Sequence, residues 1–378
     1  MFRPLFFLLL LSSLSCAAVQ ATPPTIRYDD VSYPSIPYVF SLESATGQKL
    51  EYVGTCHDND PTHLQYAILK KRFEKFLKGI NLTKTAVIIE MPDSLIPTLA
   101  RQISTTQSNA ILSQNISTSL PSNLSSKDLL VNAQSEVTEK IIDTHEDPGY
   151  AAFLASENAI SVVGGELTHK QVIEALSKDF DHNLVLYFCF VQALDFWNRS
   201  TKKSTLTERS SLGGRSTENL TLFQTLDFWK TTLTSDQTAN QAGDFEQKPT
   251  SNPLLESYVV DQVRSWTGTT TVTFNDLAAL HQSYARMVFI HDDTKLFSQL
   301  MDISNYGIPE RHLVFWGKEY ELANLFFRLL ERTHQIRDTH TLDIITKEWN
   351  AGKNLFIVYG ALHAVALKKS LEQLTKLR

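Results

Sequence analysis

Two histidines, each three residues after a glycine, are the residues whose type and spacing best suit chemistry. The first motif spans Gly54–His57 (Gly-Thr-Cys-His) and the second spans Gly360–His363 (Gly-Ala-Leu-His). Each motif follows a run typical of a β-strand, and a glycine there allows the backbone to turn sharply. In open α/β sheets, ligands bind beyond the carboxyl ends of the strands. We therefore expect the two imidazoles, which are far apart in the sequence, to be neighbours in space.

Two carboxylates follow other strand-like runs in a comparable way. Glu90 lies near the end of the apolar run 85–91, and Glu166 follows the run 160–163. In a parallel sheet these ends share one edge. Two imidazoles and two carboxylates suit a divalent ion such as zinc, manganese or cobalt, which lowers the pKa of bound water to about 7. The sequence therefore predicts a metal site with the ligands His57, Glu90, Glu166 and His363.

Each of these residues, taken alone, has a simpler interpretation. His57 fits a loop residue bonded to nearby backbone, and His363 fits the first turn of a helix with its ring against the sheet. Glu90 fits the solvent-facing rim, although a carboxylate in an apolar run is costly to bury without a partner. Glu166 fits a residue that stabilises a helix dipole. The recurrence of polar groups at four strand ends favours the shared site.

Other polar residues near these motifs have two interpretations each. Arg337 either orients a carboxylate or binds a substrate oxygen, unless it merely begins an exposed helix capped by Asp338. Asp58 and Asp60 either orient the His57 ring through a hydrogen bond or form the turn before a proline. Cys56 is either a soft ligand or nucleophile, or a small buried thiol, and the isolated position of this cysteine favours the buried thiol.

Strand-like and helix-like runs alternate along the chain. This alternation predicts an α/β fold with a central, largely parallel β-sheet flanked by helices, and the closeness of the first two strands predicts a hairpin. The strongly apolar run 184–197 is too short to span a membrane and predicts a buried helix. The expected strands are 38–42, 49–53, 85–91, 160–163 and 354–359, and the expected helices are 62–79, 149–158, 168–176, 319–332, 341–351 and 364–377.

The composition indicates one α/β domain over residues 22–378. The chain has 378 residues, of which 42% are hydrophobic, and this is ordinary for a globular protein with a large core. Two stretches rich in Ser, Thr and Asn, near 101–136 and 198–253, are expected to be polar insertions or mobile segments. The formal net charge of −6 gives no basic footprint for a nucleic acid. The expected partner is a peptide or small-molecule substrate.

Residues 1–21 have the pattern of a secretory signal peptide. Arg3 precedes an uninterrupted apolar run at 5–11, and small residues stand just before Thr22. We therefore expect a secreted or periplasmic protein with no transmembrane segment after the signal. An uncleaved N-terminal anchor is the alternative. A lipoprotein attached through Cys16 is disfavoured because Ser13 stands where leucine is usual.

The strand-end motifs resemble those of a known superfamily. Gly54–His57, Glu90 and Gly360–His363, with Arg337 before the last motif, are similar to the TIKI, TraB, erythromycin esterase and ChaN-like proteins. Glu166 lies in a segment that weakly matches an acidic motif of that superfamily. The resemblance extends over most of the chain, but only through short motifs. It implies an EreA/ChaN-like α/β sheet with its site at the strand ends.

The resemblance also implies an activity. Members of the superfamily include metal-dependent proteases, an esterase and haem-iron-binding proteins. Carried over, His57, Glu90 and His363 are metal ligands or catalytic groups, and Arg337 is a supporting residue. Several members have a glutamate where this chain has Gly54, so Glu90 is the candidate base. We therefore expect a metal-dependent hydrolase of peptidase or esterase type. The alternatives are a haem- or iron-binding uptake protein and a non-catalytic interaction protein.

Overall fold

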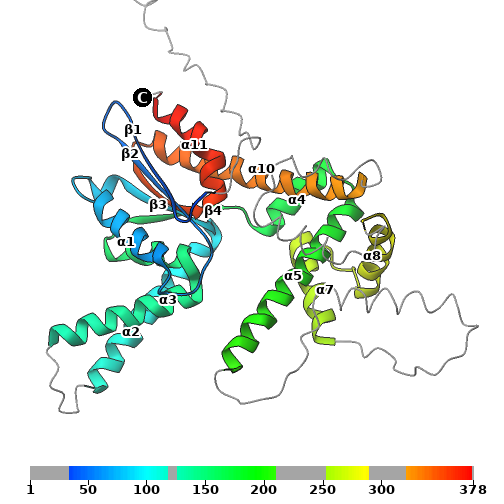
Figure 1. Cartoon of the computed structure of the whole chain (residues 1–378), viewed down its shortest axis with the longest axis horizontal. Coiled ribbons are helices and arrows are strands. Elements are labelled where there is room, and N and C mark those ends of the chain that lie inside the picture. Colours follow the sequence, from blue (N-terminus) through cyan, green and yellow to red (C-terminus); the bar gives the residue numbers. More distant parts are fainter. Residues whose placement is uncertain (1–33, 118–125, 210–252, 289–320, 377–378) are drawn as a thin grey trace, which may run out of the picture.

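The computed structural model describes residues 34–117, 126–209, 253–288 and 321–376. The predicted signal peptide and Cys16 lie outside these residues, as does 210–252, which is most of the second predicted insertion. Figure 1 shows two lobes, one built around a sheet and one made of helices, with helix α10 (Glu321–Asn350) running from one to the other.

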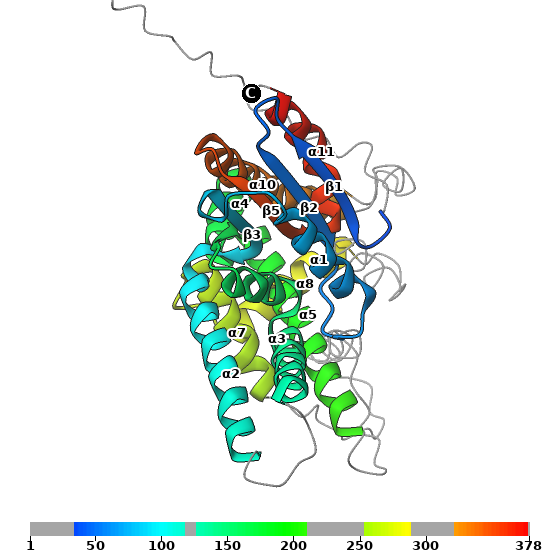
Figure 2. The same ribbon diagram turned by 90° about the vertical axis from the view of Figure 1, so that its left-hand side faces the viewer.

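The sheet of the first lobe is five-stranded and mostly parallel, and it confirms the predicted general α/β fold. Its order is β1-β2-β5-β3-β4 (Figure 2), and β1 is antiparallel to β2 while the other neighbours are parallel. The predicted hairpin is therefore formed by β1 and β2. The strands are β1 (Tyr38–Glu43), β2 (Lys49–Thr55), β3 (Thr85–Pro92), β4 (Ser161–Glu166) and β5 (Asn354–Gly360).

Alternate side chains of each central strand enter two different cores. In β5, Phe356 and Val358 join one core, whereas Leu355, Ile357 and Tyr359 join the other. This period of two is expected because successive side chains of a strand point to opposite faces of the sheet. Both faces are buried, and this explains why the strands read as continuous apolar runs in the sequence.

Helices cover both faces of the sheet. The first core includes side chains of α1 (Leu64–Phe76), α2 (Ile96–Ser117) and α3 (Ser126–Glu157). The second core includes side chains of α10 and α11 (Ala361–Lys376). Two short 3-10 helices, η1 (Leu82–Lys84) and η2 (Asp93–Leu95), flank β3.

The second lobe has a hydrophobic core of its own, separate from the sheet. It contains α4 (His169–Asp179), α5 (His182–Arg209), α7 (Pro253–Thr267) and α8 (Phe274–Val288), together with the first part of α10. The apolar run 184–197 lies within α5, and most of its side chains are buried in this core, so the prediction of a buried helix is confirmed.

The structure differs from the sequence predictions at three places in the helices. The first polar stretch, predicted to be an insertion or mobile segment, is helical at its described residues, since 101–117 belongs to α2 and 126–136 to α3. These helices pack on each other, and apolar residues at helical spacing such as Leu99 and Ile103 are buried between exposed neighbours such as Arg101 and Gln102. The predicted helices 319–332 and 341–351 are parts of the single helix α10. The predicted helix 149–158 is the end of the longer α3.

Helix α3 is kinked just before this last segment. Pro148 lies inside the helix and cannot donate a backbone hydrogen bond, while Glu146 has non-helical angles with φ of 56°. The kink places Glu146 and Asp147 beside the carboxyl end of β2, where Thr55 donates a hydrogen bond to Asp147.

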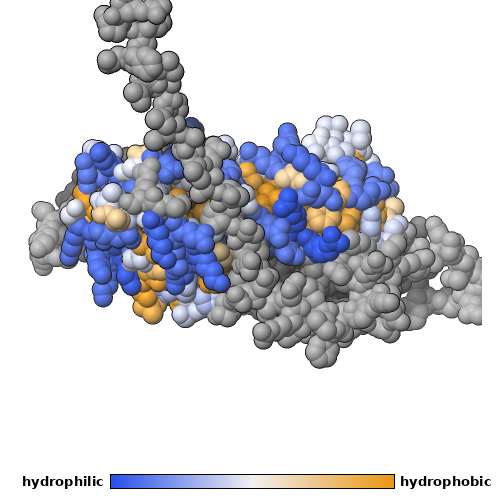
Figure 3. Space-filling model, turned by 90° about the horizontal axis from the view of Figure 1, so that it is seen from above, coloured by the Kyte–Doolittle hydropathy of each residue, from blue (hydrophilic) through white to orange (hydrophobic). Residues whose placement is uncertain are grey.

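Hydrophilic side chains dominate the coloured surface of both lobes in Figure 3, and the apolar ones appear in separate groups. Among the residues that the structure describes, none of the helices combines the length and the apolar character that crossing a membrane requires.

Candidate active site at the strand ends

The two motif glycines allow close approach between elements. Neither has a positive φ, so the predicted sharp turn is not their role. A Cβ on Gly54 would lie 2.9 Å from the backbone of Ala361, the first residue of α11. A Cβ on Gly360 would lie 3.2 Å from both Glu90 Oε2 and His363 Cδ2. The first glycine therefore lets α11 pack against β2, and the second leaves room for two polar side chains of the site.

The first motif histidine forms a pair with a buried aspartate from α3. His57 Nδ1 lies 3.0 Å from Oδ1 of Asp147, whose side chain is fully buried. The other oxygen of Asp147 accepts a hydrogen bond of 2.6 Å from Thr55. Because Asp147 holds Nδ1, it orients the ring and directs Nε2 toward Glu90, 3.6 Å away. The His57 side chain is 47% exposed, so this pair is accessible to a substrate.

The second motif histidine has the same arrangement with a different helix. His363 Nδ1 is hydrogen-bonded to Asp338 of α10, and both side chains are buried. The ring also packs edge-on against Tyr359, with ring centroids 5.1 Å apart. The two aspartates belong to helices on opposite faces of the sheet. The strand ends thus carry two His–Asp pairs, and Asp338 contacts a histidine in addition to any role in the helix.

Arg337 joins the two predicted carboxylates. Its Nη2 lies 2.6 Å from Glu90 Oε1 and 2.6 Å from Glu166 Oε2, and its Nε lies 2.9 Å from Glu166 Oε2. The two glutamate side chains are only 7% and 10% exposed. Glu90 Oε2 also accepts a hydrogen bond of 2.6 Å from the backbone N–H of Gly360. Of the two roles considered from the sequence, Arg337 therefore has the contacts of a residue that orients carboxylates.

The structure does not gather the four predicted ligands around one point. Glu166 is engaged at both oxygens, since Oε1 accepts from the Leu167 N–H and Oε2 contacts Arg337 and the Tyr359 hydroxyl. Groups of three or more potential ligands with atoms within 4.8 Å occur twice among the described residues. They are Cys56–Asp58–His63 and His57–Glu146–Asp147. His57 is in the second group, but Glu90, Glu166 and His363 are in neither.

The charges of the cluster shift the pKa values of its members. Partial burial opposes the charge of His57, but Glu90 and Asp147 outweigh it and raise its pKa to about 11. Burial would raise the pKa of Glu90, but His57, Arg337 and His363 hold it well below its usual range. The pKa of His363 is also raised, because Asp338 outweighs the effect of burial. Without a metal ion, His57 and Glu90 are therefore both charged at neutral pH.

We expect the metal-free protein to keep His57 protonated at pH 7, as an imidazole titration by NMR would measure. His169, whose pKa is lowered by burial, is an internal reference that should titrate below the usual range of a histidine. The Glu90→Gln variant should lower the pKa of His57, because one of the two carboxylates that raise it is removed. A His57 ring that is neutral at pH 7 in the wild type would contradict this prediction.

The signs of these shifts also fix how the pair changes stability with pH. The raised pKa of His57 contributes stability that is complete below about pH 6.5, its unfolded value. That contribution is lost as the pH rises through the folded value. The lowered pKa of Glu90 contributes stability that is complete above about pH 4.3 and is lost as the pH falls further. His57 and Glu90 together therefore stabilise the fold most between about pH 4.3 and about pH 6.5.

Sequence reasoning missed Asp147, which the structure brings to the site. The available signal was weak, since Asp147 lies in the segment Glu-Asp-Pro-Gly, a composition typical of a turn. No motif marks it as the partner of His57, because the contact depends on the kink in α3. Tyr359 was assigned only to the last strand, but its hydroxyl reaches Glu166.

The fold and the site define an α/β protein with a charged cluster at the carboxyl ends of its parallel strands. A comparison of the chain with protein-family models, curated proteins and solved structures finds no match in any of the three. The superfamily resemblance therefore stays a prediction.

Proposed function

We propose that the protein is an extracytoplasmic hydrolase of protease or esterase type, with an EreA/ChaN-like fold and its active site at the strand ends. The observation that carries the proposal is the pair of imidazoles, each oriented through Nδ1 by an aspartate, with Glu90 close to both. The aspartate–histidine arrangement is the one that hydrolases use to fix the tautomer of a general base. The location outside the cytoplasm rests on the pattern of residues 1–21.

Three of the four predicted ligands suit a divalent metal by their chemistry. Metal-bound histidines typically donate the second ring N–H to a carboxylate, and His57 and His363 each have such a partner at Nδ1. Glu90 offers an oxygen 3.6 Å from His57 Nε2. Glu166 fits less well, because Arg337 binds its Oε2 through both Nε and Nη2 and the Tyr359 hydroxyl contacts the same oxygen, whereas Glu90 Oε2 faces His57 Nε2. We therefore propose His57, Glu90 and His363 as the ligands and Glu166 as the anchor of Arg337.

The residues around these three would prepare the site for hydrolysis. A divalent metal would supply acidification of a bound water and polarisation of a carbonyl. Asp147 and Asp338 orient the imidazoles, and Arg337 keeps Glu90 ionised beside them. His57 is the exposed member, and Nε2 is the nitrogen through which it would bind the metal, because Asp147 holds Nδ1. Glu90, which faces that atom, is the proposed base.

The proposal is tested with a panel of ester and peptide substrates and with elemental analysis of the purified mature chain. We expect hydrolysis and bound divalent metal in the wild type. In the His57→Ala and His363→Ala variants the hydrolysis should be lost and the metal content should fall by one equivalent. The exposed His182 of α5 gives a control, and His182→Ala should keep both. Hydrolysis that persists in the double histidine variant would contradict the proposal. An intense haem absorption band without hydrolysis would also contradict it and would favour the haem-binding alternative.

A further inference from the structure

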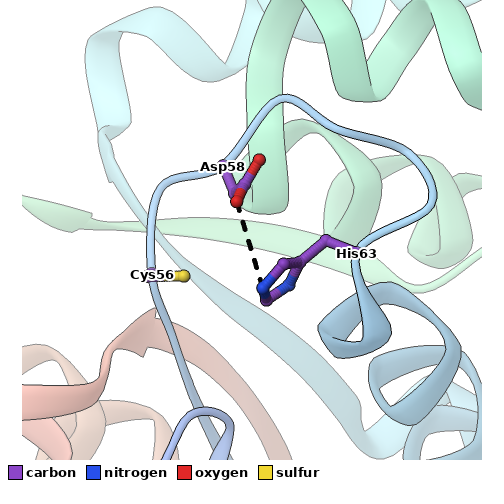
Figure 4. Close-up of side chains that lie close together, drawn as sticks. All are labelled: Cys56, Asp58 and His63. Atoms are coloured by element: carbon purple, nitrogen blue, oxygen red, sulfur yellow. Dashed lines mark ion pairs between the residues drawn. The ribbon is translucent and has the colours of Figure 1, made fainter.

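A second group of potential ligands lies in the loop between β2 and α1, separate from Arg337 and the two glutamates that it contacts. Cys56, Asp58 and His63 point toward a common space (Figure 4), and one ligand atom of each lies within 4.8 Å of the others. His63 Nε2 and Asp58 Oδ2 lie 4.0 Å apart. All three residues are half-buried. The loop therefore brings a thiol, a carboxylate and an imidazole together at an accessible point.

The loop is held in this shape by hydrogen bonds from the start of α1. The fully buried Gln65 donates to the carbonyl of Cys56 at 2.8 Å and accepts from its backbone N–H at 3.1 Å. The hydroxyl of Tyr66 donates to the carbonyl of Asp58. Asp58 Oδ1 accepts from the N–H of Asp60, and Oδ2 faces His63. The ligands are thus positioned before any ion arrives, which reduces the cost of binding one.

We propose that Cys56, Asp58 and His63 bind a transition-metal ion of the zinc class, with one coordination position open to water or an external ligand. Zinc takes sulfur, nitrogen and oxygen ligands at about 2.0–2.3 Å, and sites with three protein ligands keep the fourth position open. A thiolate ligand favours such ions over magnesium and calcium. Tetrahedral bonds of these lengths separate ligand atoms by about 3.3–3.8 Å, so the present group needs to contract by only about 1 Å.

Binding requires two adjustments of protons. Cys56 must give up its thiol proton to solvent, which is the usual requirement for a metal-bound cysteine. The thiol now donates weakly to Gln65 Oε1 at 3.5 Å, and this contact would be lost. Coordination through His63 Nε2 places the ring proton on Nδ1, which ends the long contact of 3.4 Å from the Gln65 N–H. Both lost contacts are long and therefore weak.

The position of this site gives it a consequence for the rest of the molecule. His57 stands between Cys56 and Asp58 in the chain, so an ion held by those two residues would fix the segment that carries His57. The inference itself does not depend on hydrolysis, because its ligands differ from the proposed catalytic residues.

The test uses Co²⁺ as the probe, added to the metal-free full mature chain under reducing conditions. We expect Co²⁺ in excess over both proposed sites to give a thiolate-to-cobalt charge-transfer band in the near ultraviolet, which only a cysteine ligand produces. The band should disappear in Cys56→Ser. The affinity for Co²⁺ should fall at least about tenfold in His63→Gln, since even the loss of a residue that merely supports a ligand costs 10- to 100-fold.

Two controls separate this site from the rest of the protein. Cys189→Ala changes the other described cysteine, which lies in the core of the helical lobe, and should keep the band. His57→Ala should also keep it, so failure of the strand-end site would leave this result intact. No charge-transfer band in the wild type, or an equal band in a Cys56→Ser variant with unchanged circular dichroism, would overturn the proposal.

Discussion

Replacing Arg337 with alanine is expected to lower the free energy of unfolding by about 3–5 kcal/mol, the usual cost of removing one partner from a buried ion pair. The guanidinium is 24% exposed and contacts two carboxylates that are almost fully buried. Without it, Glu90 and Glu166 would share a poorly solvated space with no positive charge between them. The loss should be visible in urea unfolding monitored by circular dichroism.

Arg332, on the same helix, provides a matched control. It forms an ion pair of 2.7 Å with Asp179, but both side chains are more than 40% exposed. Such exposed pairs contribute about 0.2–1 kcal/mol, so Arg332→Ala should change stability by no more than that. Equal losses in the two variants would show that burial does not strengthen the Arg337 contacts, and this would contradict the prediction.

The pH dependence of the Arg337→Ala variant adds a second check. Unpaired buried carboxylates have raised pKa values and take up protons more readily than in the wild type. Glu90 loses one of the positive charges that lower its pKa and therefore takes up a proton at a higher pH in the variant than in the wild type. The deficit in stability relative to the wild type should therefore shrink as the pH falls. A deficit that is constant between pH 7 and pH 4 would mean that charge is not its cause.

The strands were the most predictable part of the fold. Each strand that the sequence predicted is present, and each boundary agrees with the structure within three residues. The central strands are buried on both faces, so their sequences are continuous apolar runs that end in glycine or a charged residue. The register of β2 with β5, in which Gly54 faces Tyr359 and Thr55 faces Gly360, places the two histidine motifs side by side.

The helices were harder to predict because tertiary packing decides where they begin and end. Serine- and threonine-rich sequence in α2 and α3 indicated an insertion, yet a few buried residues such as Ile103 and Ile141 are enough to hold these helices on the sheet. In α10 the polar residues between 333 and 340 suggested a break. The structure continues the helix through them, because Arg337 and Asp338 use that turn to reach the site.

For the site, the sequence identified chemical groups but not their partners. Glu166 and His57 were both candidate ligands when only the strand ends were considered, and Glu166 had the weaker motif. The structure distinguishes their roles. Arg337 binds Glu166, whereas Asp147 holds His57 Nδ1 and leaves Nε2 turned toward Glu90. Which atom meets which depends on the kink in α3 and the path of α10, and neither follows from a local pattern.

Asp147→Asn is expected to reduce hydrolytic activity by about 10²–10⁴-fold while the fold is retained. This range covers the contribution of a positioned general base and the loss seen when the orienting carboxylate of a catalytic histidine becomes an amide. Asparagine has the shape of aspartate, so the hydrogen bond from Thr55 can remain on its carbonyl oxygen. The amide nitrogen then faces His57 Nδ1 and donates to it. The ring is forced into the tautomer with its proton on Nε2, the atom that should act as base or ligand.

Two measurements distinguish this effect from a general structural loss. The pKa of His57 should fall in Asp147→Asn, because one of the charges that raises it is removed, and the pH profile of the residual activity should shift with it. Asp179→Asn, which alters an exposed carboxylate of α4, should change neither quantity. If Asp147→Asn keeps activity within about threefold of the wild type, His57 does not depend on its aspartate. The assignment of the His57–Asp147 pair to catalysis would then be wrong, and the pair would be only a structural contact between β2 and α3.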